Sequence, residues 1–146
     1  MTAAGPGKIR EIHLNTTSDP STLAPTRIAI EDLAKQIGFD EKTVWNIGLC
    51  VNEAMANITR HAYAGRTDGK VEVTAKPDHG GISITLRDWG SGKDPSKMPQ
   101  KEPDPMRPGG LGMICLRQML DTVNFEPQPD GMRLVLIKKL RSEKAE

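Results

Sequence analysis

Apolar and small residues recur at the 3.6-residue period of an α-helix along one uninterrupted stretch of the chain: Val44, Ile47, Gly48, Val51, Met55, Ile58 and Ala62. Asp40 precedes this stretch, and its carboxylate can accept hydrogen bonds from the unpaired amide groups of a first helical turn. The pattern therefore predicts a long helix that starts after Asp40 and presents one continuous apolar face. If that face packs on a sheet, the opposite side of the helix faces solvent or a cavity.

The other periodic segments predict strands and shorter helices around this long helix. Helical spacing that stops at Gly38 indicates a helix end, because glycine tolerates positive φ. The expected order is a strand at residues 8–15, a helix ending near Gly38, the long helix, a hairpin of residues 71–75 and 82–86, a helix at residues 111–123, and a last hairpin of residues 123–126 and 132–139. Helices mixed with antiparallel hairpins favour an α+β fold, a two-layer sandwich in which a mixed, mainly antiparallel sheet is covered by helices on one face. The length of 146 residues fits one domain spanning residues 1–146.

Charge and composition argue against several classes of function. The 20 basic and 19 acidic residues nearly cancel, and no segment concentrates lysine or arginine, so nucleic acid is not the expected partner. The amino terminus lacks the apolar stretch of a signal peptide, and no run of about 18 apolar residues occurs, so we expect a cytoplasmic protein without a membrane partner. Cys50 and Cys115 lie far apart in helical patterns, which predicts reduced core thiols.

Glu53 and Asn57 are four residues apart and therefore lie on one side of the long helix, roughly opposite the apolar stripe of Val51 and Met55. Two interpretations are open. The pair belongs to a solvated helix face, or it lines a cavity. In a cavity, the amide oxygen of Asn57 could bind a hard cation, and the carboxylate of Glu53 could accept a proton from water or a hydroxyl group.

Asp88 stands at the end of a predicted strand and opens the sequence Asp-Trp-Gly-Ser-Gly at residues 88–92. Gly90 and Gly92 allow the backbone to turn sharply and to approach a ligand closely. The Asp88 carboxylate can accept a hydrogen bond there, for example from an exocyclic amino group. An ordinary tight turn has the same composition, so this motif alone leaves both interpretations open.

A glycine run at residues 109–113, Gly-Gly-Leu-Gly-Met, opens directly into the predicted helix at residues 111–123. Amide groups in a first helical turn are unpaired and lie at the positive end of the helix dipole, so they attract phosphate. The spacing departs from G-x-x-x-x-G-K-[ST], which excludes a P-loop. A flexible hinge is the alternative interpretation. The proline-rich residues 93–109 before this run are expected to form a functional lid.

The three motifs occur in an informative order along the chain. Residues 51–63, with the pattern N-E-A-x-x-N-x-x-x-H-A-Y, resemble the N box of the Bergerat-fold ATPases, also called the GHKL or histidine-kinase-like superfamily. Residues 88–92 resemble the G1 box of these proteins, and residues 109–123 resemble their G2 box and its helix. Within the superfamily, the chain is most similar to the bacterial anti-sigma-factor serine/threonine kinases.

The resemblance implies a role for each matching residue. Asn57 would bind the Mg²⁺ ion that bridges the phosphates of ATP, and Asp88 would accept a hydrogen bond from the adenine amino group. Glu53 would act as the general base toward the attacking hydroxyl group. The resemblance implies that the remaining cofactor-binding positions surround the nucleotide: Gly90, Gly92, Gly110, Leu111, Gly112 and Met113.

The resemblance also implies a function, an ATP-dependent protein serine/threonine kinase that acts as an anti-sigma factor. Such a protein binds a sigma factor, phosphorylates an anti-sigma-factor antagonist and forms a homodimer. Two alternatives are an ATP-binding regulatory module that controls a protein partner without phosphotransfer, and a detached histidine-kinase-like catalytic domain. The sequence leaves open the roles of Trp89, which packs on nucleotide or caps the strand, and of the lid residues Lys97, Lys101 and Arg107. Arg60 and His61 adjoin the first motif at the end of the helix, where His61 either lies near the phosphates or has a structural helix-end role, since the dipole favours a cation there.

Overall fold

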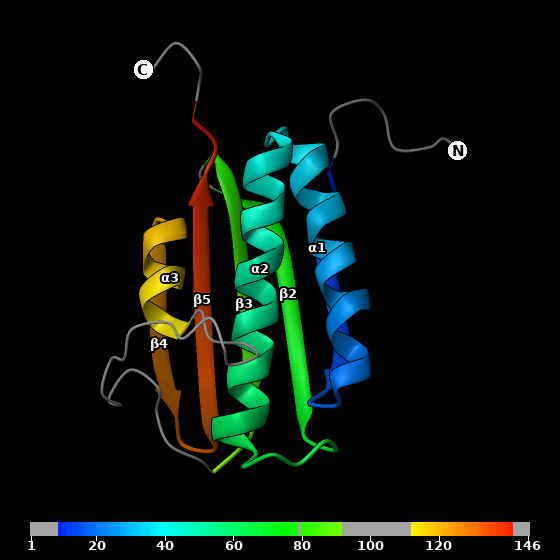
Figure 1. The fold of residues 1–146 in the computed structure, drawn as a ribbon, viewed down its shortest axis with the longest axis vertical. Coiled ribbons are helices and arrows are strands. Elements are labelled where there is room, and N and C mark those ends of the chain that lie inside the picture. The colour runs from blue at the N-terminus through cyan, green and yellow to red at the C-terminus, as the bar shows by residue number, and fades with distance from the viewer. Residues whose placement is uncertain (1–8, 79, 92–111, 142–146) are drawn as a thin grey trace, which may run out of the picture.

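Three helices cover one face of a five-stranded sheet in the computed structural model, which describes residues 9–78, 80–91 and 112–141 (Figure 1). The elements follow one another as β1 (Ile12–Thr17), η1 (Pro20–Thr22), α1 (Leu23–Ile37), α2 (Glu41–Asn57), η2 (Ile58–Ala62), β2 (Lys70–Asp78), β3 (Gly81–Asp88), α3 (Gly112–Met119), β4 (Thr122–Gln128) and β5 (Gly131–Lys139). The strand order is β1-β2-β3-β5-β4, and every pairing described is antiparallel. The α+β fold with helices on one face is therefore confirmed.

The core lies between the helices and the sheet. Alternate residues of β2, β3 and β5 point toward the helices and are buried, as the period of two in a half-covered sheet requires. The apolar stripe of α2 packs in the same core, which confirms the prediction of a long amphipathic helix. Its central members are all nearly or fully inaccessible to solvent: Val44, Ile47, Cys50, Val51, Ala54 and Met55.

Both predicted boundaries around α2 are confirmed. The Asp40 carboxylate accepts a hydrogen bond from the Thr43 amide at 2.8 Å, so it caps the first turn of α2. Gly38 ends α1 with φ at 118°, a left-handed conformation that glycine adopts without strain. Cys50 is a buried thiol whose sulfur lies 3.7 Å from that of Met119 on α3, as expected for a reduced core residue.

Two predicted boundaries were wrong. The first strand occupies Ile12–Thr17 rather than residues 8–15, because its pairing with β2 continues to Thr17 opposite Lys70. The helix α3 ends at Met119 rather than at residue 123. The Asp121 amide donates to the Ile137 carbonyl at 2.9 Å, so strand pairing with β5 begins there and places Val123 in β4. A run of apolar residues at helical spacing did not reveal this change of conformation.

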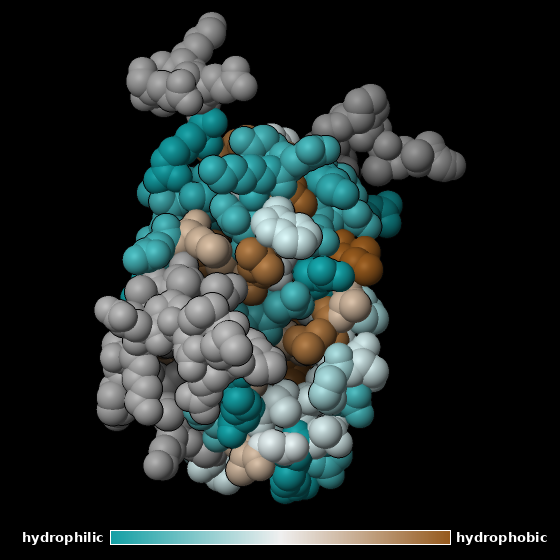
Figure 2. All heavy atoms as spheres, viewed as in Figure 1, coloured by the Kyte–Doolittle hydropathy of each residue, from teal (hydrophilic) through white to brown (hydrophobic). Residues whose placement is uncertain are grey.

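The helix-covered side of the molecule is mainly hydrophilic, with apolar residues in separate small patches (Figure 2). Ile28 on α1 and Trp45 on α2 are exposed large apolar side chains. Within the described ranges, no helix combines the length and the apolar character needed to cross a bilayer.

Candidate functional site

A polar cluster is buried at the end of α2. Glu53 is 3% exposed and Asn57 is 8% exposed, so the interpretation as a solvated helix face is wrong for this pair. The guanidinium of Arg60 donates to the Asn57 amide oxygen at 2.6 Å, and one of its nitrogens lies 3.4 Å from a Glu53 carboxylate oxygen. A cation therefore accompanies the buried carboxylate, as the energetics of burying charge require.

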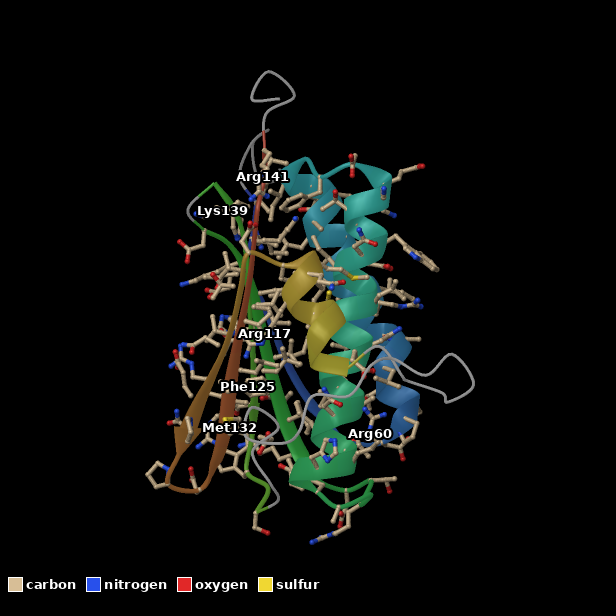
Figure 3. All side chains as sticks on the ribbon, turned by 60° about the vertical axis from the view of Figure 1, so that its left-hand side comes forward. Arg60, Arg117, Phe125, Met132, Lys139 and Arg141 are labelled. Atoms are coloured by element: carbon tan, nitrogen blue, oxygen red, sulfur yellow. The ribbon has the colours of Figure 1, made fainter. Side chains whose placement is uncertain are left out.

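Arg60 is the residue of this cluster that sequence reasoning missed. The sequence placed it only beside the first motif at the helix end, although residues 53, 57 and 60 follow the i, i+4, i+7 spacing of one helical side. The chain continues from α2 into η2, a π-helical turn in which the Tyr63 amide donates to the Ile58 carbonyl at 3.1 Å. Figure 3 shows Arg60 at this end of the helix.

Replacing Arg60 with alanine is expected to reduce the free energy of unfolding by about 1–2 kcal/mol. The substitution leaves the Glu53 carboxylate buried without this cation, although the 43% exposure of the Arg60 side chain moderates the loss. Denaturant unfolding measures the effect. Arg66→Ala is the matched control, because the Arg66–Asp68 ion pair is 71% exposed on both sides and should contribute almost nothing. An equal loss in both variants would contradict the assignment.

Asp88 ends β3 and is also buried, at 4% exposure. Its carboxylate accepts a hydrogen bond from the Gly90 amide at 3.0 Å. Burial raises the pKa of Asp88 above its ordinary value, and this effect outweighs the lowering by the backbone amides of Gly90 and Met132 and by Arg87. Asp88 pairs with Met132 across the β3–β5 ladder, and Figure 3 shows Met132 at the same end of the molecule as Arg60.

Trp89 packs between two cations of the sheet. Its ring centroid lies 4.4 Å from the Lys70 ammonium and 4.4 Å from the Arg87 guanidinium, a cation–π arrangement. Arg87 is itself paired with Asp130 in the turn between β4 and β5. The ring of Trp89 thus contacts side chains at the start of β2 and near the end of β3, and its packing on nucleotide stays a prediction.

Gly90 brings the strand end against the helix end. A Cβ atom at this position would lie well inside van der Waals contact with the Ala62 carbonyl at the end of η2. Only glycine permits this approach without movement of one backbone relative to the other. The predicted site residues of the first two motifs therefore lie on two segments in contact. Glu53 and Asn57 belong to the helix that η2 continues, and Asp88 and Gly90 lie at and just after the end of β3.

Replacing Gly90 with alanine is expected to lower stability by about 1–3 kcal/mol and to weaken nucleotide binding together with it. The added methyl group meets backbone rather than a flexible side chain, so the turn that carries Asp88 must shift. Thermal unfolding with and without nucleotide measures both effects. Ser91→Ala, at the exposed neighbouring position, should change neither. A Gly90→Ala protein that behaves like Ser91→Ala would show that the contact is relaxed in solution.

The third motif is only partly described. Gly112 and Met113 form the start of α3, as predicted for the helix entrance. In Figure 1, α3 runs opposite to α2, so its first turn lies toward the end of the sheet at which α2 finishes. Gly92, Gly110, Leu111, the lid at residues 93–109 and its Lys97, Lys101 and Arg107 lie outside the described residues.

The oxygen atoms of this cluster suit a magnesium ion that is bound mainly by phosphates and water. Mg²⁺ prefers oxygen ligands and commonly takes only one or two of them from the protein. Asn57 offers an amide oxygen, and the Glu53 carboxylate lies on the same helical side one turn earlier. The described residues hold no group of three or more His, Cys, Asp and Glu that would form an all-protein metal site.

The described residues combine helices on one face of an antiparallel sheet with a contact between the end of η2 and the turn after β3, an α+β arrangement consistent with the GHKL-like ATPase fold. The family model described as "Histidine kinase-like ATPase domain" matches residues 16–138. The chain belongs to this family.

Two relatives in this family are named as a protein kinase and as an anti-sigma factor. The chain is 23% identical over 144 residues to the serine-protein kinase RsbW of Listeria innocua, in an alignment that covers 93% of this chain and 91% of the relative. It is 26% identical over 140 residues to the anti-sigma F factor of Halalkalibacterium halodurans, with coverage of 92% and 96%. The whole length of these relatives is thus nearly matched.

A solved structure supports the fold independently. The RsbU and RsbW domains of a Mycobacterium tuberculosis protein superpose with a TM-score of 0.66 at 16% sequence identity. The match covers 90% of this chain and 32% of that one, so the chain corresponds to about a third of the larger protein. At this identity the likeness concerns the fold alone.

Proposed function

We propose that the protein is an ATP-dependent serine/threonine kinase that acts as an anti-sigma factor. One observation carries the proposal: α2, which bears the buried Glu53–Asn57 pair, continues into η2, and the last residue of η2 contacts Gly90, two positions after the buried Asp88 of β3. A carboxylate, an amide oxygen and a second carboxylate are the groups that nucleotide binding and hydroxyl activation need. The relatives named serine-protein kinase RsbW and anti-sigma F factor support the same activity.

Each residue has a distinct task in this proposal. Asp88 accepts a hydrogen bond from the adenine amino group, and Asn57 holds the Mg²⁺ ion with its amide oxygen. Glu53 removes the proton from the attacking serine or threonine hydroxyl. When bound with ATP, Mg²⁺ would supply neutralisation of the phosphate charge. The glycine-rich positions let the backbone approach the nucleotide: Gly90, Gly92, Gly110, Leu111, Gly112 and Met113.

Arg60 adds a change of side-chain contacts to the proposed binding of ATP. In the structure its guanidinium donates to the Asn57 amide oxygen at 2.6 Å and lies 3.4 Å from a Glu53 carboxylate oxygen. We expect this cation to turn toward the phosphates when nucleotide binds, because they carry more negative charge than the Glu53 carboxylate. Glu53 and Asn57 would then be released for proton transfer and ion binding.

The partners follow from the same proposal. We expect a sigma factor and an anti-sigma-factor antagonist to bind, the chain to form a homodimer and one domain to span residues 1–146. We also expect the protein to act in the cytoplasm. Size-exclusion chromatography with light scattering would test the homodimer, and a monomer at all concentrations would contradict it.

Phosphotransfer from labelled ATP to the cognate antagonist tests the activity. The expected product is an acid-stable phosphoserine or phosphothreonine on the antagonist. An acid-labile phosphoprotein would favour a detached histidine-kinase-like catalytic domain instead. Binding of ATP without any phosphoprotein, in a folded sample that still controls its partner, would favour a regulatory module without phosphotransfer.

A further inference from the structure

The Tyr63 hydroxyl lies between the ends of two strands of the sheet. In the β2–β3 ladder, Val71 stands opposite Asp88, so continuing the register would place Lys70 opposite Trp89 and join them directly. Instead, the Tyr63 hydroxyl accepts a hydrogen bond from the Trp89 amide at 2.9 Å and donates to the Lys70 carbonyl. The hydroxyl thus replaces the next rung of the ladder, and its proton and one lone pair are both used.

The ring of Tyr63 is held firmly enough to define where this hydroxyl lies. Tyr63 follows η2 directly, and its amide donates to the Ile58 carbonyl at 3.1 Å. A Cβ atom at Gly69 would overlap the ring, so the ring packs flat on this glycine. The Gly69 amide is in turn bonded to the Ser18 hydroxyl at 3.0 Å. Burial raises the pKa of the Tyr63 phenol, so its proton stays available for the bond to Lys70.

The Trp89 amide belongs to the peptide group that follows Asp88. Fixing this amide fixes the backbone from which the Asp88 carboxylate extends, and the carboxylate is further held by the Gly90 amide at 3.0 Å. Gly90 itself contacts Ala62, the residue before Tyr63. Ala62, the last residue of η2, and Tyr63, which follows it, therefore contact Gly90 and Trp89, the two residues after Asp88.

We infer that Tyr63 is a positioning residue for adenine recognition: its hydroxyl sets the place of Asp88 relative to the helix that carries Asn57. The inference rests on the proposed role of Asp88 in binding the adenine amino group. It goes further because it assigns nucleotide selectivity to a side chain that touches neither the base nor the phosphates. The Tyr63 hydroxyl fixes the Trp89 amide and thereby the position of the Asp88 carboxylate, and the packing of the Tyr63 ring on Gly69 holds the hydroxyl in place.

Comparison of two nucleotides in Tyr63→Phe tests the inference. Inosine triphosphate carries a carbonyl oxygen where ATP carries the amino group, so it cannot donate to Asp88. We expect the wild type to bind ATP about tenfold or more tightly than inosine triphosphate, both with Mg²⁺, because a hydrogen bond to a charged group is lost. In Tyr63→Phe we expect ATP affinity to fall about threefold to tenfold while inosine triphosphate affinity stays within about twofold, so the ratio shrinks.

Two further variants distinguish positioning from general stability. Asp40→Ala removes the carboxylate that accepts the Thr43 amide at 2.8 Å and caps the first turn of α2, at the end of the helix far from Tyr63. It should lower the melting temperature without changing the ratio. Gly69→Ala keeps the Tyr63 hydroxyl but displaces the ring, so it should reduce the ratio as Tyr63→Phe does.

The outcomes separate the inference from the proposed function. A wild type that binds ATP and inosine triphosphate equally would overturn the role of Asp88 and, with it, the inference. A selective wild type whose ratio is unchanged in both Tyr63→Phe and Gly69→Ala would overturn the inference alone. A ratio that falls in these two variants and not in Asp40→Ala supports it.

Discussion

Glu53→Gln is expected to lower the rate of phosphotransfer by about 10²- to 10⁴-fold, the contribution typical of a general base. Affinity for ATP should stay within about threefold, because the proposed contacts to adenine and Mg²⁺ come from Asp88 and Asn57 rather than from Glu53. The rate is measured in single turnovers with saturating ATP and antagonist. Affinity is measured separately from the thermal shift with Mg-ATP.

Glutamine is the right substitution at this position because Glu53 is buried. The Glu53 side chain is only 3% exposed, so alanine would leave a cavity in its place. A lower phosphotransfer rate could then result from the loss of the general base or from the loss of packing. Glutamine keeps the volume, and its amide oxygen can still accept a hydrogen bond from Arg60. What it cannot do is take a proton from a hydroxyl group.

Glu41→Gln provides the matched control for the same chemical change. Glu41 lies exposed in the first turn of the same helix, α2, at the end far from the site. Its replacement should leave the phosphotransfer rate unchanged and lower stability only by a few tenths of a kcal/mol through the helix dipole. A Glu53→Gln enzyme as fast as Glu41→Gln would contradict the role of Glu53 as general base. Positioning of the substrates by Asn57 and Asp88 would then have to account for the rate.

The sequence predicted the elements whose pattern is local. The stripe of α2 and its Asp40 cap needed no tertiary information, because the 3.6-residue period and a capping carboxylate act within one helix. The two hairpins were found for the same reason, since alternation and turn residues are close in sequence. The end of α3 was misplaced because pairing of Thr122 with Ile137, fifteen positions along the chain, decided the conformation there.

The burial and the hydrogen bonds of the site residues could not be predicted from local sequence patterns. Glu53 and Asn57 lie on one side of the helix, as their spacing predicts, but the spacing did not show that both are buried or that Arg60 donates to Asn57. The role of Tyr63 depends on a strand register between Lys70 and Trp89 that the sequence does not encode locally. Spacing on one helix is visible from the sequence. A hydroxyl inserted between two strands is visible only from their arrangement.

Asp88→Asn is expected to weaken ATP binding by about 10- to 100-fold and, at the same time, to leave the nucleotide-free protein as stable as the wild type or more stable. The loss of affinity follows from replacing a charged acceptor of the adenine amino group with a neutral one. The gain in stability follows because asparagine can still accept the Gly90 amide bond while the buried charge disappears. Isothermal titration with Mg-ATP and denaturant unfolding without nucleotide measure the two effects.

The pH dependence of that stability difference gives the sharper test. Burial raises the pKa of Asp88 in the folded protein, so folding carries the cost of a buried carboxylate fully at a pH above the raised value. As the pH falls through the raised pKa and past the ordinary value, the folded carboxylate takes up its proton and this cost disappears. The advantage of Asp88→Asn should therefore be largest near neutral pH and should shrink on acidification. An Asp88→Asn protein less stable than the wild type at neutral pH would mean that the carboxylate stabilises the fold, so that its burial would no longer point to a ligand.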